Sequence, residues 1–102
     1  MANMLLAGLG PTHPGEILAE DVLPALRISK TDFARRLNVS RQTLYDILSG
    51  TKPITTPTAL KLGRLLGNDA GFWLRMQTAY DLAVAEREMA DELAAIERLQ
   101  AA

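Results

Sequence analysis

The stretch that most constrains the fold is residues 30–49, KTDFARRLNVSRQTLYDILS, because it predicts two short helices joined by a tight turn. In its first half, Phe33, Ala34 and Leu37 recur at helical spacing on one face, while charged residues occupy the other face. Asn38 stands where the chain must turn, and asparagine tolerates the left-handed conformation better than most residues that carry a Cβ. The sequence therefore predicts a sharp corner between two packed helices.

The second predicted helix begins near Arg41 and has a narrow apolar stripe. Ser40 is suited to be its N-cap, because a serine hydroxyl can accept a hydrogen bond from an unpaired backbone N–H of the first turn. Gly50 is expected just after its last residue, where glycine commonly ends helices. The stripe that faces the core consists of Leu44, Ile47 and Leu48.

The polar face of this helix carries side chains suited to reading nucleic-acid bases. Arg41 can donate two hydrogen bonds to guanine, and Gln42 can pair through two hydrogen bonds with adenine. Asp46, one turn later, can accept from cytosine N4 or orient Arg41 or Gln42. Tyr45 can stack, contact a thymine methyl group or reach a phosphate. A solvated polar face is the alternative, and the face taken alone leaves both interpretations open.

Flanking residues and local charge favour the nucleic-acid interpretation. Residues 27–64 carry eight bases and two acids, whereas residues 1–26 carry three acids and no base, and residues 65–102 carry three bases and seven acids. The formal net charge of −1 therefore conceals a basic centre of the kind that binds phosphates. Side chains placed to hold phosphates on either side of a groove are Lys30, Ser40, Thr43, Thr51 and Lys52.

The order F-A-x-x-L-N-V-S-R-Q-T-L-x-x-I-L-S-G resembles the Cro/cI-like (XRE) helix-turn-helix family. The wider frame is similar to the HigA antitoxins of bacterial toxin–antitoxin operons, from about Pro11 to Glu86. That frame comprises HPGEIL at 13–18, the motif above, and then PITTPTALKLGRLLGN and FWLRMQTAYDLA. The chain departs from the family pattern at Asn38, where glycine is usual, and in residues 87–102, which extend past the common core.

The resemblance implies an all-α fold: a five-helix Cro/cI-like (lambda repressor-like) helix-turn-helix domain with an extended C-terminal helix. It divides the chain into an N-terminal arm (1–12), a helix-turn-helix domain (13–86) and a C-terminal helical extension (87–102). It also implies a dimeric transcriptional repressor that binds an inverted-repeat operator in double-stranded DNA and neutralises a RelE-like ribonuclease toxin.

Outside the motif, several helix boundaries can be predicted from local residues. Pro14 is expected at the first position of a helix that Pro24 breaks or kinks, and Ser29 is expected to cap the next helix. Thr56 and Pro57 predict the N-cap and first residue of a helix that runs to about Leu66. Asp69 is expected to cap the helix after it.

The residues from Asp81 to Leu99 contain strong helix formers and no breaker, which predicts a final helix of roughly thirty residues. Its apolar positions recur at sevens, fours and threes, as for a helix that meets a partner helix or a groove in another protein. A frayed, solvated tail is the alternative, because an acidic, alanine-rich end without a packing partner is only marginally helical. The apolar positions are Leu82, Met89, Leu93 and Ile96.

Large apolar and aromatic side chains are concentrated between residues 72 and 80, more often a sign of core than of a binding surface. In a domain of 102 residues, however, one copy offers limited area to cover them. We therefore expect a homodimer whose interface includes Trp73, Met76 and Tyr80.

The composition argues against an enzyme, a cofactor and a metal site. The chain has no cysteine and a single histidine, so disulfides and zinc or transition-metal sites are not expected. His13 and Glu16 are interpreted as the start of a helix, because no nucleophile or second base accompanies them to form a catalytic site. Residues 1–9 are apolar but lack a basic leader and are too short to span a membrane, so we expect a cytoplasmic protein.

A second hypothesis is a protein–protein adaptor whose helix-turn-helix does not read DNA and whose long final helix binds the partner. The acidic Asp46 in the predicted reading helix favours this alternative, because a carboxylate repels phosphates.

Overall fold

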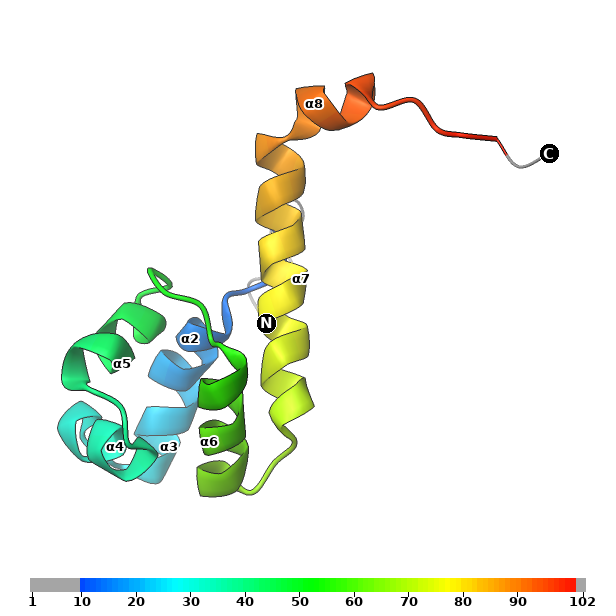
Figure 1. The fold of residues 1–102 in the computed structure, drawn as a ribbon. Helices are drawn as coiled ribbons and strands as arrows, with labels where there is room; N and C mark the ends of the chain where they lie inside the picture. Colours follow the sequence, from blue (N-terminus) through cyan, green and yellow to red (C-terminus); the bar gives the residue numbers. More distant parts are fainter. Residues whose placement is uncertain (1–9, 101–102) are drawn as a thin grey trace.

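The computed structural model describes residues 10–100, and over that range the chain contains helices and no strands (Figure 1). Residues 1–9, most of the predicted N-terminal arm, lie outside the described residues. The predicted all-α domain with an extended C-terminal helix is confirmed. In chain order its elements are α2 (Pro14–Ile17), the π-helical η1 (Leu18–Val22), α3 (Leu23–Leu26), α4 (Lys30–Leu37), α5 (Arg41–Leu48), α6 (Thr56–Leu66), α7 (Ala70–Glu88) and α8 (Ala90–Ala95).

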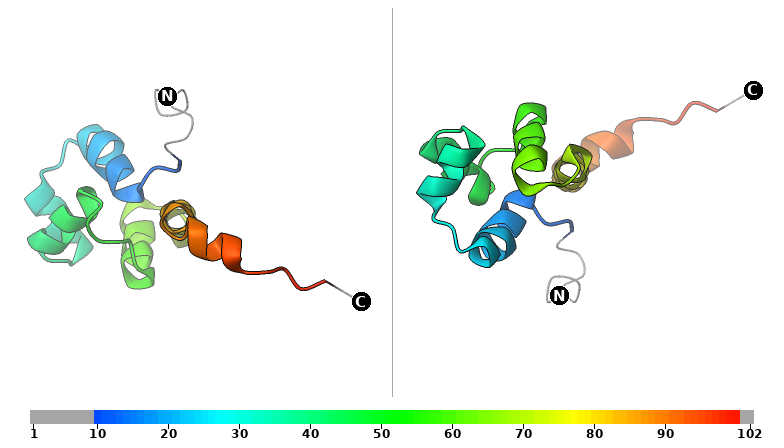
Figure 2. Two further views of the ribbon diagram at one scale, coloured as in Figure 1. Left: turned by 90° about the horizontal axis from the view of Figure 1, so that it is seen from above. Right: turned by 90° about the horizontal axis from the view of Figure 1, so that it is seen from below.

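The elements α2 to α6 form a cluster, and α7 lies along one side of this cluster and extends beyond it (Figure 1). Seen from above and from below, α7 stands nearly end-on beside α6, and α8 leads away from the cluster (Figure 2). No helix in residues 10–100 is both long and apolar enough to cross a bilayer.

Pro24 does not break the first helix. The Leu23 N–H donates to the Leu18 carbonyl, a five-residue step that belongs to a π-helix, and the chain stays helical to Leu26. Because proline has no N–H, it cannot continue the α-helical hydrogen-bond pattern to the residue four before it. Of the two outcomes predicted at Pro24, a break or a kink, the break is therefore wrong, and the wider π-helical turn accommodates the proline. The helix ends at Arg27, which is left-handed with φ 54°.

The predicted N-caps are confirmed at three helices. The Ser29 hydroxyl accepts from the Asp32 N–H at 3.0 Å, and Asp69 accepts from the Gly71 N–H at 3.2 Å. Ser40 caps α5 in the same way. For α6 the prediction is wrong by one residue, since Thr55 is the N-cap and Thr56 is the first helical residue. Both threonines are chemically able to cap, so the local sequence does not distinguish them.

Of the two outcomes that the sequence left open for the C-terminus, the single helix of about thirty residues is wrong, and the solvated tail agrees with the structure. Helix α7 ends at Glu88, Met89 leaves helical geometry with φ −103° and ψ 15°, and only the short α8 follows. Every residue from 86 to 100 is exposed, so little buried surface supports the helix there. Helix propensity alone gives only marginal helicity at this length.

The core lies between the first helical segment, the two helices of the motif, α6 and the first turns of α7. Gly63 allows α6 to approach the start of α7 closely, because a Cβ there would lie 2.8 Å from the Asn68 carbonyl oxygen. The buried apolar residues are Leu18, Leu23, Phe33, Ala34, Leu37, Leu44, Ile47, Ile54, Ala59, Leu62 and Trp73.

Candidate nucleic-acid interface

The turn between α4 and α5 has the left-handed residue that the sequence predicts. Asn38 has φ 59° and ψ 48°, and its N–H donates to the Arg35 carbonyl while the Val39 N–H donates to the Ala34 carbonyl, each at 3.1 Å. This pair of hydrogen bonds ends α4 and turns the chain. The Lys61 ammonium of α6 donates to the Asn38 carbonyl at 2.9 Å and fixes the corner to the rest of the domain.

Helix α5 buries its apolar side and exposes its polar N-terminal turn. Leu44 and Ile47 are buried, whereas Arg41 and Gln42 are exposed and the Tyr45 side chain retains 44% of its accessible surface. The predicted base-reading residues therefore lie on the outer side of the helix, except that Asp46 is only partly exposed. The Arg41 side chain makes no hydrogen bond or ion pair with any residue between 10 and 100, which leaves its guanidinium available to a ligand.

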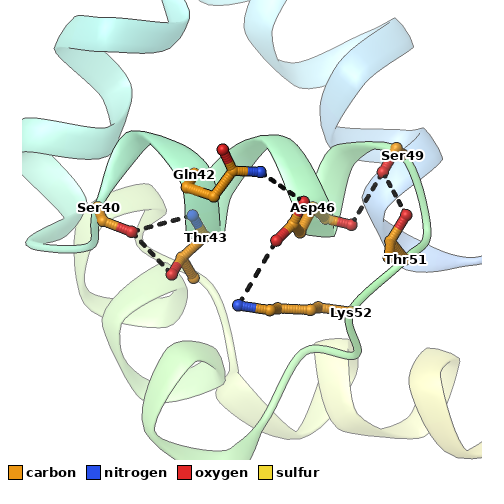
Figure 3. Close-up of polar contacts among 7 residues, drawn as sticks. All are labelled: Ser40, Gln42, Thr43, Asp46, Ser49, Thr51 and Lys52. Atoms are coloured by element: carbon orange, nitrogen blue, oxygen red, sulfur yellow. Dashed lines mark hydrogen bonds and ion pairs between the residues drawn. The ribbon is translucent and has the colours of Figure 1, made fainter.

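Asp46 connects α5 to the loop that follows it (Figure 3). Its Oδ1 accepts from Gln42 Nε2 at 2.9 Å, and its Oδ2 lies 3.5 Å from Lys52 Nζ. Its backbone carbonyl accepts from the Thr51 N–H at 2.8 Å and from the Lys52 N–H at 3.0 Å. The loop residues that we expect to contact phosphate are thus held against the end of α5.

The other predicted phosphate ligands lie at the beginnings of α4 and α5. Ser40 Oγ accepts from the Thr43 N–H at 3.0 Å and donates to Thr43 Oγ1 at 2.8 Å, so both hydroxyls stand at the positive end of α5 (Figure 3). The Lys30 ammonium lies 5.5 Å from the centre of the Tyr45 ring, a cation–π contact. Thr51 Oγ1 shares a hydrogen bond of 2.9 Å with Ser49 Oγ.

A charge cluster on α4 holds the exposed arginines of that helix. Asp32 accepts hydrogen bonds from Arg36 and from Arg35, and these bonds lower the pKa of the Asp32 carboxyl below its ordinary value. All three side chains are partly or largely solvated, so the cluster contributes little to stability.

The first helix supports the end of α5 through a contact that the sequence did not reveal. A Cβ on Gly15 would lie 1.7 Å from the Ile47 carbonyl oxygen, so only glycine fits there. His13 caps α2 by accepting from the Gly15 N–H at Nδ1, at 2.9 Å, and its ring meets the Tyr80 ring edge-on at 4.9 Å. Burial lowers the pKa of the His13 imidazole, against smaller opposing effects that begin with the charge of Asp81.

Gln77 is a second residue that sequence reasoning missed. Its side chain is buried, and its Oε1 accepts from the Ile54 N–H at 2.8 Å while its Nε2 donates to Asp81 Oδ1 at 2.9 Å. This amide ties the loop after α5 to α7. The spacing of four from Trp73 places Gln77 on the buried face of α7, but nothing local indicates a partner 23 positions away.

The structure separates the three residues predicted at the dimer interface. Trp73 is 2% exposed and its indole N–H donates to Asn68 Oδ1 at 3.1 Å, so this side chain belongs to the core of one chain. Its burial no longer requires a second copy. Met76 and Tyr80 are partly buried, and the outward face of α7 carries Leu82, which is 59% exposed. No group of three or more potential metal ligands is present among residues 10–100.

Comparison with known proteins places this geometry in a family. Residues 22–73 match the helix-turn-helix family model. The chain is 46% identical over 76 residues to virulence-associated protein I of Dichelobacter nodosus, a match that covers 74% of this chain and 70% of that protein. It is 36% identical over 72 residues to antitoxin HigA-1 of Vibrio cholerae, covering 71% of this chain and 68% of that protein.

Two solved structures have the same fold over most of the chain. The Pseudomonas aeruginosa antitoxin HigA with the higBA promoter matches with a TM-score of 0.83 and 37% identity, covering 88% of this chain and 99% of that one. Antitoxin GraA in complex with its operator matches with a TM-score of 0.83 and 38% identity, covering 92% and 96%. Three of these four relatives are named as antitoxins. The chain therefore belongs to the XRE-type helix-turn-helix family of DNA-binding proteins, within the group that includes the HigA antitoxins.

Proposed function

We propose that this chain is a sequence-specific DNA-binding antitoxin and transcriptional repressor of a type II toxin–antitoxin operon. The observation that carries the proposal is the exposed first turn of α5, where Arg41 and Gln42 project from a helix whose other face is buried. Such a turn is the part of a recognition helix that meets base edges in the major groove. The likeness to antitoxins solved with promoter or operator DNA supports this function.

Side chains suited to contact DNA phosphates lie around this turn and support the same mode of binding. Lys30, Ser40 and Thr43 lie at the beginnings of α4 and α5, and Thr51 and Lys52 lie just beyond the end of α5. In the proposed complex these groups contact phosphates and fix the register of the helix in the groove.

The operator is proposed to be an inverted repeat that two copies of the chain bind together. A homodimer built on α7 presents two recognition helices to successive major grooves about one helical turn apart. The outward face of α7 offers Leu82 and a shallow hollow of about 430 Å³ lined by residues including Leu74 and Ala79. Met76 and Tyr80 of the same helix are partly buried, and the Tyr80 ring contacts His13.

The proposed toxin partner is a RelE-like ribonuclease encoded beside this gene, as the resemblance to HigA implies. Co-expression of the two neighbouring reading frames should relieve the growth arrest that the toxin frame causes alone. The two proteins should also copurify when only one carries an affinity tag. Growth arrest that persists despite expression of this chain contradicts the antitoxin function and leaves DNA binding unaffected.

The adaptor hypothesis loses its supporting observation. It rested on an acidic residue in the reading helix, but both oxygens of Asp46 have partners, and one partner is the Lys52 ammonium. The carboxylate therefore does not face the groove as an unpaired charge. DNA reading remains the function that the geometry of α5 supports best.

Fluorescence anisotropy with DNA from upstream of the gene tests the DNA-binding function. The probe is a labelled duplex of about 30 base pairs, long enough for two half-sites one helical turn apart, and the control is the same duplex with its sequence shuffled. We expect at least a thousandfold tighter binding to the upstream duplex at physiological salt, in the range typical of specific regulators, roughly 10³–10⁷. Equal affinity for both duplexes would contradict the proposal.

A further inference from the structure

We propose that Asp46 is a positioning residue for Gln42, not a base contact, and that it restricts the base read by Gln42 to adenine. The inference rests on the proposed function, because it requires α5 to enter the major groove. Of the roles that the sequence left open for Asp46, base contact or orientation of Arg41 or Gln42, it selects the orientation of Gln42.

The hydrogen bond between the Gln42 and Asp46 side chains fixes the orientation of the Gln42 amide. Gln42 and Asp46 are four residues apart on α5, so their side chains lie one above the other on the same side of the helix. An ionised carboxylate can only accept hydrogen bonds, so the amide nitrogen must face Asp46 Oδ1, at 2.9 Å. The amide oxygen consequently points away from Asp46, as Figure 3 shows.

Asp46 is itself held in place from the other side. Its Oδ2 pairs with Lys52 Nζ at 3.5 Å, and the Thr51 and Lys52 N–H groups donate to its backbone carbonyl. The ammonium also offsets the negative charge that the carboxylate would otherwise bring towards DNA phosphates. With one partner on each oxygen and only 22% of its side-chain surface exposed, Asp46 is less available to a base than Gln42 is.

The fixed amide presents one particular hydrogen-bonding edge. An amide nitrogen carries two hydrogens, so Gln42 keeps one donor beside its free oxygen acceptor after Asp46 has used the other. Adenine offers the complementary pair in the major groove, the N6 donor and the N7 acceptor. Guanine offers two acceptors, O6 and N7. The Gln42 oxygen, itself an acceptor, would face one of them and could form no hydrogen bond with it.

Removal of Asp46 should therefore change which base is accepted. A Gln42 amide without its partner can rotate by half a turn and direct its NH₂ group at guanine. The expected effect is a loss of discrimination at one position of each half-site, and a weaker effect on overall affinity. A residue that read its own base would instead alter the preference at a different position.

The test is selection of bound duplexes from a pool with a randomised central region, followed by sequencing. The proteins are the wild type, Asp46→Ala, Gln42→Ala and the double variant. The wild type should prefer adenine over guanine about tenfold or more at the position where Gln42→Ala loses preference, as expected for one bidentate contact. Asp46→Ala should lower this preference to about twofold at that same position, and the double variant should match Gln42→Ala.

Two further variants separate this role from general effects of charge and folding. Glu20→Ala removes one exposed acid from η1 and should keep the full adenine preference. Asp46→Asn retains the size and one acceptor of Asp46, so it should fold like the wild type and give an intermediate preference. The thermal unfolding midpoint of each variant shows whether the protein is folded under the conditions of the DNA selection.

The outcomes distinguish this inference from the function on which it rests. An unchanged adenine preference in folded Asp46→Ala and Asp46→Asn overturns the inference and leaves the DNA-binding function intact. Loss of preference at a position that Gln42→Ala does not affect overturns it too, because Asp46 then reads its own base. A wild-type protein that selects no sequence at all overturns the proposed function, and the inference with it.

Discussion

Gly15 shows how a single residue positions the recognition helix. Its Cα lies so close to the carbonyl end of α5 that a methyl group would overlap the Ile47 carbonyl oxygen. Gly15→Ala should therefore force the two helices apart and lower the free energy of unfolding by about 1–3 kcal/mol, the usual cost of overpacking. Urea denaturation measures this change.

Gly71 provides the matched control. It is also helical, but a Cβ there would meet only the ends of the flexible Arg75 and Asp69 side chains, each at 3.0 Å. Gly71→Ala should be neutral or stabilise by up to about 1 kcal/mol, because alanine favours helix more than glycine does. Equal effects of the two substitutions would show that the contact with Ile47 is not tight in solution.

His13 makes stability depend on pH in the mildly acidic range. Because burial lowers its pKa in the folded protein, the unfolded chain binds the proton more readily. The contribution of neutral His13 is present above its ordinary pKa of 6.5 and is lost as pH falls through the lower folded value. His13→Asn, which retains a side chain able to cap α2, should abolish this loss.

Urea denaturation of both proteins at pH 7.5 and near pH 5 tests the role of His13. The wild type should lose more stability than His13→Asn on acidification. Asp32 does not interfere, since its lowered pKa makes its contribution disappear only as pH falls below its ordinary value of 3.8. Parallel losses in both proteins would assign the pH dependence to other groups.

Arg41, Gln42 and Lys52 should affect DNA binding in two distinct ways. Arg41→Ala and Gln42→Ala should lower affinity for the operator by about 1–3 kcal/mol each and leave binding to shuffled DNA nearly unchanged. Lys52→Ala should weaken binding to both DNAs alike and reduce the slope of log affinity against log salt by about one. Anisotropy titrations at several salt concentrations measure both. Equal losses on both DNAs for all three variants would exclude base readout by α5.

At the scale of elements, the sequence predicts best what depends on residues a few positions apart. The caps at Ser29 and Ser40 and the left-handed Asn38 all involve contacts within five residues, and each is where the pattern predicts it. The apolar faces of α4 and α5 follow from helical periodicity for the same reason. The recognition helix was therefore predictable with its exposed residues.

Contacts between distant positions were not predictable in this way. Gln77 meets Ile54 across the fold, and Gly15 meets Ile47, although neither pair has a local pattern. The sequence also does not show that Trp73 is buried within one chain, where its indole N–H donates to Asn68. The sequence also left the end of α7 open, because helix propensity alone does not decide between a continuous helix and a solvated tail beyond Glu88.

The elements after Met89 should contribute little to the stability of the domain. Residues 89–100 are all exposed, so a chain that ends at Glu88 loses little buried surface. Its unfolding free energy should stay within about 0.5 kcal/mol of the full chain, and its affinity for operator DNA should be retained. A larger loss on truncation, measured by urea denaturation, would mean that α8 packs on another copy or on the domain in solution.

At the scale of the whole molecule, the proposed dimer depends on the outward face of α7. Leu82→Asp places a charge at the centre of this face and should convert the dimer to a monomer, with at least tenfold weaker binding to an inverted repeat. Leu60→Asp is the matched control, because Leu60 of α6 is similarly exposed, at 62%. Light scattering after gel filtration measures the mass. A dimer that survives Leu82→Asp and dissociates with Leu60→Asp would assign the interface to α6.

The buried amide of Gln77 links the loop after α5 to the helix at the proposed dimer interface. It fastens the backbone of Ile54, two residues beyond Lys52, to the helix on which the two copies are proposed to meet. The loop that is proposed to contact phosphates and the helix that is proposed to form the dimer interface therefore move as one rigid unit. An extra base pair between the half-sites rotates one of them by roughly 35°. A rigid dimer cannot adjust to this rotation, so we expect the protein to bind poorly to operators with altered spacing between the half-sites.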